Sequence, residues 1–568
     1  MFIDKTFVCL LVFSLFGEAW AAPPEPASVP AVEAVEEAVE LEPVIVWGER
    51  RGDEFSVSGM ETRGATSGAD VLEESAQFHT TPDSRGERPV TYRGFEQTQL
   101  EVRFEGVELS LPFDGGVDLG KIATPFLRTV RVLPGALPGL VGSNALGGTV
   151  ELLPLRAGDL DGVMGDLWSR QPGGGGASLL VGERGNGEGD WLLGAFVDGA
   201  VGVPFSGRTP ESMRSGEGGL RRNSDHFMAG GYASAHTRLA PGHDVTLMMM
   251  QLQGEWGVPE ERFAAKPRYW RWSKWAMTAA NLEYSARLGE RVEGEVALLG
   301  VWPTNTLESY DDNTYSSQEN PSAWTSRYDD RRLGGRFAGR WRTHESAVSG
   351  WPAMVEWSTA WFHERHRESD GASATGEVER VVGEVGAMLR GRPASWLRWG
   401  VSTMTHGEIP SDAGESLWSF SPSGAATFLL PAGFSTRLAL SRRVRMPTLK
   451  ERHSSALGYR EANLDLGPET SWNAQGDVRW RFAETGHVQL SLYGAFVEGL
   501  VQEIALESGL LQLQNIESAT LLGMAGEVQW RPLSWLDLEV EGSGLRARRG
   551  DSPGHLAYRP GFKVRGSL

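Results

Sequence analysis

Few residues of this chain have the types and the spacing that could do chemistry. His363-Glu364-Arg365-His366 places two histidines three residues apart, whereas two zinc ligands on one helix face stand four apart. In a strand these histidines would fall on opposite faces, so we interpret them as ordinary residues at a loop end. Asp311-Asp312-Asn313 and Asp329-Asp330 offer oxygen ligands suited to calcium, but they lack the spacing of a calcium loop. Solvated acidic loops are the better interpretation.

The sequence does not predict an enzyme. It contains no nucleophile elbow, Walker loop, glycine-rich dinucleotide turn or zinc helix. Its formal net charge is −20, which disfavours nucleic acid as a partner, because binding phosphates requires positive surface. We therefore expect no catalytic residue, no cofactor, no resident metal and no nucleic-acid partner.

The N-terminus has the pattern of an export signal. Lys5 supplies a positive charge, residues 6–16 form a short apolar core, and Ala19-Trp20-Ala21 is a cleavage site of small-x-small type. The one cysteine, Cys9, lies inside this signal, so the mature chain would contain no thiol and no disulfide. The sequence predicts a signal peptide over residues 1–21 and a destination in the cell envelope.

A flexible arm is predicted after the signal. Residues 22–42 are rich in Pro, Ala, Val and Glu and have too little bulky apolar surface to offset the entropy of ordering. A short β-prone run, Pro43-Val44-Ile45-Val46, follows within residues 22–54. It is either a linker with a few chance β-branched residues or a strand that pairs with the sheet edge of a partner.

The longest part of the chain alternates apolar and polar residues. Residues 281–288, 475–482 and 536–544 all show this period of two, which is the strand pattern. A soluble sandwich also alternates, but many segments reach the nine or so residues that cross a bilayer as a tilted strand. Short turns such as 531–534 alternate with long polar stretches such as 308–332, which favours a membrane β-barrel. Beyond the signal no run of about 18 apolar residues occurs.

The segment from Val90 to Leu153 resembles the plug domain of TonB-dependent outer-membrane receptors. The likeness is carried by Arg93-Gly94 at the end of a strand, by residues 102–107, and by the turn Gly142-Ser143-Asn144 with Gly147-Gly148. A second likeness lies in Arg445-Met446-Pro447-Thr448-Leu449-Lys450-Glu451, which is similar to the family's Arg-x-Pro-Thr-x-x-Glu loop. Asn463-Leu464, residues 467–472, Asn515, Gly523 and Glu527 also fall where the family has matching residues.

This resemblance implies an all-β transmembrane fold, an antiparallel outer-membrane barrel of about 22 strands occluded by an N-terminal α+β plug. We assign residues 55–156 to the plug and residues 157–568 to the barrel. The chain ends without the closing aromatic residue of the family, so we expect either a C-terminal truncation or an unusually small barrel.

The resemblance also implies contacts between plug and barrel. The family pairs plug arginines with inward-facing barrel glutamates, which makes Glu527 the candidate partner of Arg93. Where the family usually has a second plug arginine this chain has Pro134-Gly135, and where the matching strand usually has glutamate it has Gln475. Because an unpaired buried charge is costly, we hypothesise that these two changes compensate each other as a neutralised ion pair.

The implied function is energised import. TonB, driven by its inner-membrane complex, would pair with a TonB box at Pro43, Val44, Ile45 and Val46 and displace the plug. The barrel would contact outer-membrane lipid and lipopolysaccharide, and the cargo would be a small metal chelate. A ferric siderophore leads, with cobalamin, haem or another metal chelate as alternatives, and His453 is a weak candidate ligand residue for haem. From another class, a passive porin or an adhesive barrel stays open, although neither needs a plug or an arm.

Overall fold

A computed structural model describes residues 54–57, 64–83, 85–170, 173–185, 189–206, 219–261, 266–343, 354–370, 374–411, 414–455, 460–483, 485–550, 556 and 559–567. The chain divides into two units, Met1–Pro43 and Val44–Leu568, and all described residues belong to the second. The predicted signal peptide with Cys9, and the TonB box Pro43 to Val46 in the arm, lie outside the described residues.

The N-terminal part of the second unit is a small α+β domain, the plug. Its main sheet has the strand order β1-β6-β7-β4-β5, in which β4 and β7 are parallel and the other pairs are antiparallel, and β2 and β3 form a separate hairpin. Its elements are β1 (Glu54–Ser56), α3 (Gly68–Glu73), β2 (Phe78–Thr80), β3 (Val90–Tyr92), η1 (Gln97–Gln99), β4 (Leu100–Phe104), β5 (Val107–Glu108), η2 (Leu119–Lys121), η3 (Thr124–Phe126), β6 (Leu127–Pro134) and β7 (Gly148–Pro154). The helix α3 begins with a capping box, in which Ser67 accepts from the Asp70 N–H and Asp70 accepts from the Ser67 N–H.

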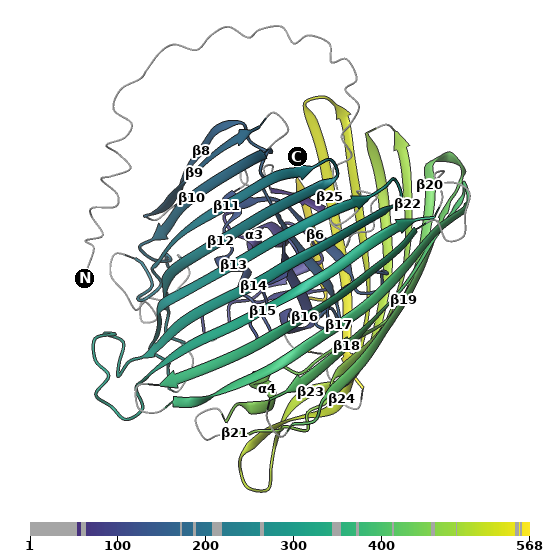
Figure 1. Ribbon diagram of the computed structural model, residues 1–568. Coiled ribbons are helices and arrows are strands. Elements are labelled where there is room, and N and C mark those ends of the chain that lie inside the picture. The colour runs from purple at the N-terminus through teal and green to yellow at the C-terminus, as the bar shows by residue number, and fades with distance from the viewer. Residues whose placement is uncertain are drawn as a thin grey trace, which may run out of the picture. The chain divides into compact units, whose positions relative to one another are not determined.

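The remaining strands form a closed antiparallel barrel around the plug, as Figure 1 shows. They are β8 (Gly162–Arg170), β9 (Gly174–Arg184), β10 (Gly189–Ala200), β11 (His226–Ala240), β12 (His243–Val258), β13 (Trp270–Leu288), β14 (Val292–Ser309), β15 (Trp324–Arg342), β16 (Met354–Asp370), β17 (Ala374–Ala394), β18 (Leu397–Pro410), β19 (Leu417–Leu429), β20 (Phe434–Arg445), β21 (Arg460–Glu461), β22 (Glu469–Ala483), β23 (Gly486–Ala505), β24 (Leu511–Leu533), β25 (Leu536–Arg549) and β26 (Phe562–Ser567). The described part also contains η5 (Pro431–Gly433) and α4 (Leu449–His453).

Strand order follows the chain, except that β21 pairs with β24 and β20 pairs directly with β22. The predicted strands lie inside β13, β22 and β25, so the alternation identified them correctly. The described residues form 19 barrel strands, β8 to β26, compared with the roughly 22 that the resemblance implied.

The two ends of the barrel differ in the length of their connections. Residues 241–242, 395–396 and 534–535 are tight turns at one end. At the other end β14 and β15 are joined by the longer connection 310–323, and β10 is separated from β11, and β20 from β22, by more than twenty residues of sequence. We call the second end the loop end. The polar stretch 308–332, which we predicted to be a loop, is partly strand: β14 ends at Ser309 and β15 begins at Trp324, so the loop is limited to 310–323. Polar side chains are normal in this strand because its inner face meets the plug rather than lipid.

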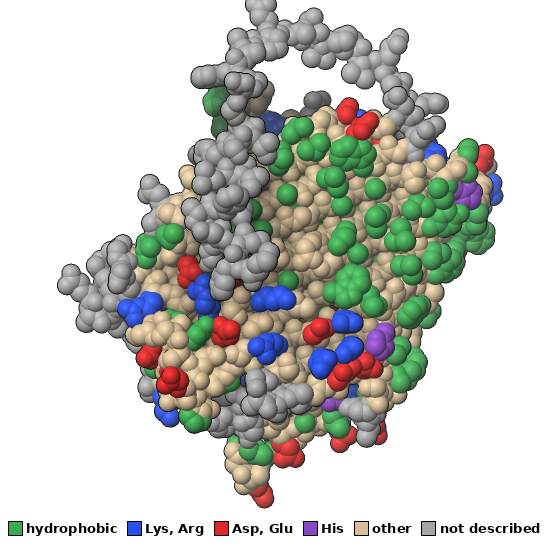
Figure 2. All heavy atoms as spheres, turned by 60° about the vertical axis from the view of Figure 1, so that its left-hand side comes forward, with side chains coloured by type: hydrophobic (Ala, Val, Ile, Leu, Met, Phe, Trp, Pro, Cys, Tyr) green, Lys and Arg blue, Asp and Glu red, His purple; other side chains and the backbone are tan. Residues whose placement is uncertain are grey.

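The outer and inner faces of the barrel have opposite chemistry. Large exposed hydrophobic side chains such as Leu247, Trp361 and Leu492 alternate with inward positions that are buried against the plug. Figure 2 shows hydrophobic side chains spread over this face of the wall, with many of the charged ones gathered toward its lower end. In the described residues, no helix is long and apolar enough to cross a membrane.

Candidate functional site at the plug–barrel interface

The turn from Gly142 to Gly148 depends on glycine for two different reasons. The Gly142 N–H donates to both carboxylate oxygens of Glu101, at 3.2 and 3.1 Å, and a Cβ at Gly142 would lie 2.3 Å from one of them. Gly148 has φ +142° and a Cβ there would lie 2.4 Å from the Leu133 carbonyl oxygen. A side chain at either position would therefore push the turn away from β4 or β6. Ser143 is buried in the same turn.

Arg93 connects the plug to the barrel wall. It has φ +50° and is followed by Gly94 at φ +89°, so its side chain leaves a tight turn. Its Nε donates to Gln77 at 2.7 Å, and its Nη1 donates to the Gln475 Oε1 of β22 at 2.8 Å. The guanidinium also lies over the Tyr493 ring, 4.4 Å from its centroid.

Gln475 is the barrel residue at the other end of this contact. It contacts the plug arginine that is present, Arg93, and its own amide donates to Asp477 at 2.8 Å. An amide can accept from a guanidinium and donate to a carboxylate at the same time, which the carboxylate of a glutamate cannot. Arg443 of the barrel donates to the carbonyls of this plug turn, at Gly135 and Leu137. The hypothesis that Gln475 compensates for Pro134 stays a prediction.

The predicted pair between Arg93 and Glu527 stays a prediction. Glu527 lies in β24, where its carboxylate is 3.2 Å from the His487 Nε2. The described contacts of Arg93 include Gln77, Gln475 and the rings of Tyr92 and Tyr493.

Replacing Gln475 by leucine should loosen the plug. The change removes two hydrogen bonds and leaves both a buried guanidinium N–H and an Asp477 oxygen without this partner, at a cost of about 1–3 kcal/mol. Thermal unfolding of the purified receptor in detergent measures the effect. Gln253→Leu, on an exposed outward position, is the control. Equal unfolding temperatures for the two variants would contradict the assigned bridge.

Four inward-facing charges cross the barrel wall in a row. Arg332 of β15 and Glu364 of β16 are directly opposite, as are Glu364 and Arg380 of β17. Glu364 accepts from the Arg332 Nη1 at 2.6 Å and from the Arg380 Nε at 2.5 Å. Arg380 then donates to Glu408 of β18 at 2.8 Å. All four side chains are more than nine-tenths buried, and each is paired with at least one neighbour of opposite charge.

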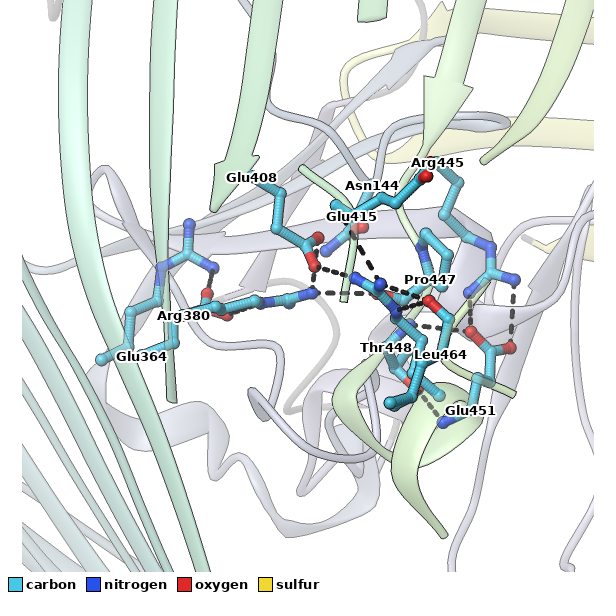
Figure 3. Close-up of polar contacts among 12 residues, drawn as sticks. Asn144, Glu364, Arg380, Glu408, Glu415, Arg445, Pro447, Thr448, Glu451 and Leu464 are labelled. Atoms are coloured by element: carbon cyan, nitrogen blue, oxygen red, sulfur yellow. Dashed lines mark hydrogen bonds and ion pairs between the residues drawn. The ribbon is translucent and has the colours of Figure 1, made fainter. Parts of the chain in front are cut away.

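The two ends of this row contact residues outside the barrel wall. At one end, Arg452 of α4 donates to Glu408 at 3.0 Å. At the other, Arg332 is 2.6 Å from the carboxylate of Glu108 in plug strand β5, which also accepts from the Asn144 side chain at 2.9 Å. Figure 3 shows Arg380 and Glu408 directed toward one another beside α4, with Asn144 of the plug close by. The loop end of the barrel is thus joined to the plug turn through buried charges.

The family-like loop at residues 445–451 builds α4. Thr448 caps the helix by accepting from the Glu451 N–H, and Glu451 accepts from the Thr448 N–H at 2.8 Å, which is a capping box. Arg445 donates to Glu451 from its Nη1 and Nη2, at 2.9 and 3.0 Å, and to Glu469 from its Nε, at 2.7 Å. Gln99 of the plug donates to the same Glu469 at 3.0 Å. The motif is therefore a structural one that fixes α4 above the plug.

The helix α4 lies against the turn of the plug that faces the loop end. The Lys450 N–H donates to the Phe113 carbonyl at 3.0 Å, and its ammonium group is 2.5 Å from the Asp114 carboxylate. Phe113 also stacks on His366, with 3.6 Å between ring centroids. Burial alone would raise the pKa of Asp114, but Lys450 and Arg85 outweigh it and hold that pKa well below its ordinary value.

This depressed pKa gives the contact a defined pH dependence. The stabilisation is complete above the unfolded pKa of about 3.9 and is lost as the pH falls through the lower folded value. Asp114→Asn should therefore lower the unfolding temperature at neutral pH, and the difference from wild type should shrink in strong acid. Asp161→Asn, at an exposed position, is the control. A difference that is independent of pH would show that the ionised carboxylate is not its source.

Several side chains that the sequence assigned to loops lie in strands. Asp330 of β15 is buried and lies 2.5 Å from the His366 Nδ1 of β16, so it is not part of a solvated loop. His363 and His366 do fall on opposite faces, the first 46% exposed and the second buried. Asp311 and Asp312 are in an exposed loop, where their carboxylates accept hydrogen bonds from neighbouring backbone N–H groups and hydroxyls. His453 ends α4. No cluster of His, Cys, Asp and Glu that could hold a metal occurs among the described residues.

Two family descriptions match the chain. The TonB-dependent Receptor Plug Domain matches residues 54–149, and the TonB dependent receptor-like beta-barrel matches residues 219–565. The barrel match alone covers more than half of the 568 residues, so the chain belongs to the TonB-dependent receptor family. The proteins of this family are receptors and transporters of the outer membrane rather than enzymes. No curated protein sequence matches the chain.

Solved structures resemble the whole described fold. The siderophore receptor PirA from Acinetobacter baumannii aligns with a TM-score of 0.70 at 12% identity, over 90% of this chain and 82% of that one. The pyoverdine receptor FpvA from Pseudomonas aeruginosa PAO1 gives 0.69 at 12% identity, over 90% and 79%. The copper transporter OprC gives 0.67 at 15% identity, over 85% and 76%. At these identities the likeness concerns the fold alone.

Proposed function

We propose that this receptor binds a scarce nutrient at its loop end and imports it with energy supplied through TonB. The observation that carries the proposal is the plug, which is held inside the barrel by buried ion pairs and hydrogen bonds. A plug seated in this way must be displaced before any solute passes, and displacement requires work. A passive porin or an adhesive barrel would have no use for such a plug.

The leading cargo is a ferric siderophore. Support comes from PirA and FpvA, two structural relatives whose names give siderophore and pyoverdine as their ligands. OprC is named a copper transporter, which keeps another metal chelate as an alternative, together with cobalamin and haem. Haem use would require a histidine ligand, for which His453 at the end of α4 is the candidate.

The TonB box at residues 43–46 is proposed as the point of attachment for TonB. An extended peptide of β-branched residues can add a strand to an exposed sheet edge. The arm precedes β1, which is paired in the plug sheet, so a pull on the arm would act first on that sheet.

Growth on defined nutrients tests this proposal. A host that lacks its own receptors is complemented with the full-length gene and grown on ferric siderophores, haem or cobalamin as sole source. Rescue by one source names the cargo class, and loss of haem-dependent rescue in His453→Ala would favour haem. If no source rescues growth although the receptor is present in the outer membrane, the siderophore proposal fails.

A further inference from the structure

A buried ladder of alternating charges runs from α4 to the plug. Every contact in it is an ion pair or a hydrogen bond of 3.0 Å or less, and each member lies next to a group of opposite charge or to a polar amide. We call this set the ladder, and its members in order are Arg452, Glu408, Arg380, Glu364, Arg332, Glu108 and Asn144.

Both oxygens of each carboxylate in the ladder contact another ladder member. Glu408 gives one oxygen to Arg452 and the other to Arg380. Glu364 is divided in the same way between Arg380 and Arg332. Glu108 gives one oxygen to Arg332 and one to Asn144. Loss of any member therefore leaves a buried neighbour with an unfilled position. Outside the ladder, Arg380 and Arg452 also donate to backbone carbonyls, at Pro447 and Leu464.

Because the ladder is buried, a change of contact at either end of it is expected to affect the other contacts. The ion-paired side chains of the ladder are at most 8% exposed, so water cannot replace a lost partner. If α4 moves away with Arg452, Arg380 is the one ladder arginine that still contacts Glu408. The hydrogen bond between Arg380 and Glu364 then changes as well. At the plug end, a displacement of Arg332 would change its contact with Glu108, and Glu108 holds the turn 142–148 by accepting from the Asn144 side chain. A buried charge network of this kind favours a few discrete arrangements over gradual change.

We propose that the ladder is a positioning device that couples α4 to the plug turn 142–148. When α4 is docked, the ladder is complete and the turn is held; when α4 is displaced, the turn is loosened. The coupling is reciprocal, so a plug pulled from below would also weaken the seat of α4. The proposal deepens the import function and rests on it for its use, because α4 lies at the loop end, where a ligand would arrive.

Hydrogen exchange of the full-length receptor in detergent, without ligand or TonB, tests the coupling. Arg452→Gln removes the α4 end of the ladder, and the double variant Glu364→Gln/Arg380→Gln interrupts its middle while keeping the total charge. We expect Arg452→Gln to speed exchange in residues 142–148 at least about fivefold when the ladder is intact. In the interrupted background the same substitution should leave this exchange unchanged, which is the signature of coupling in a double-mutant cycle.

A matched control lies on the same two strands. Glu356 of β16, which is buried, and Arg390 of β17, which is 19% exposed, form an ion pair outside the ladder. In the background Glu356→Gln/Arg390→Gln, Arg452→Gln should still speed exchange in the turn. Thr448→Ala, which removes the cap of α4 and leaves every side chain of the ladder in place, provides a second way to loosen the helix.

Two results would overturn the proposal. The first is equal acceleration of the turn in the intact and interrupted backgrounds. The second is unchanged exchange in the turn when α4 itself exchanges faster in Arg452→Gln or Thr448→Ala. Either failure leaves the import function standing, because growth on a nutrient is measured separately. Conversely, if no nutrient rescued growth of cells with the wild-type receptor, the hydrogen-exchange test of the coupling would still be valid.

Discussion

Cells whose only copy of the receptor carries Ile45→Pro are expected to lose growth on the nutrient that the wild type imports. Proline has no N–H and fixes φ, so it cannot contribute to a β-ladder with TonB. Ligand binding at the loop end should persist, since the substitution lies in the arm. Growth and surface binding of the same nutrient, measured in parallel, separate the two steps.

The control for this substitution is Ile45→Val. Valine keeps the N–H and the β-branched side chain, so transport should be retained. Growth that continues in the proline variant would place the TonB contact elsewhere in the chain. Loss of binding as well as growth would indicate a misassembled receptor, which outer-membrane fractionation detects.

Glu364→Leu is expected to cause a large loss of stability. It removes the one carboxylate that Arg332 and Arg380 share, and so leaves buried positive charge uncompensated. Breaking a buried pair in this way costs about 3–5 kcal/mol. Denaturant unfolding of the receptor in lipid vesicles, followed by tryptophan fluorescence, measures the change.

The matched control is Glu379→Leu on β17. Glu379 lies 3.6 Å from His363 in a pair that is more than a third exposed, and exposed pairs contribute only about 0–1 kcal/mol. A similar loss of stability in both variants would mean that position on the strand, rather than the buried charge row, determines the effect.

The sequence predicted the fold well because its signals are local. Alternation in residues 281–288 and 475–482 requires only that one face meet lipid and the other meet the plug. The loop Arg445 to Glu451 was recognisable for a similar reason, since its capping box is complete within seven residues. The glycines of the turn 142–148 were also visible, although their partners Glu101 and Leu133 were not.

The contacts between strands could not be predicted in the same way. Arg332, Glu364 and Arg380 are adjacent only because β15, β16 and β17 have a particular register, which no short segment encodes. Arg332 and Asp330 were placed in a loop because their charge resembles that of a solvated segment. Their spacing of two residues was the available signal, because charges on alternate positions indicate a strand with a polar inner face.

We expect import of the nutrient to require TonB, and binding of the nutrient to proceed without TonB. Radioactive iron supplied as a mixture of ferric siderophores, given to cells with and without TonB, tests it most directly. We predict surface-bound iron in both strains and accumulation inside the cell in the TonB-containing strain alone. Equal accumulation in the two strains would contradict the account and return the protein to the class of passive channels.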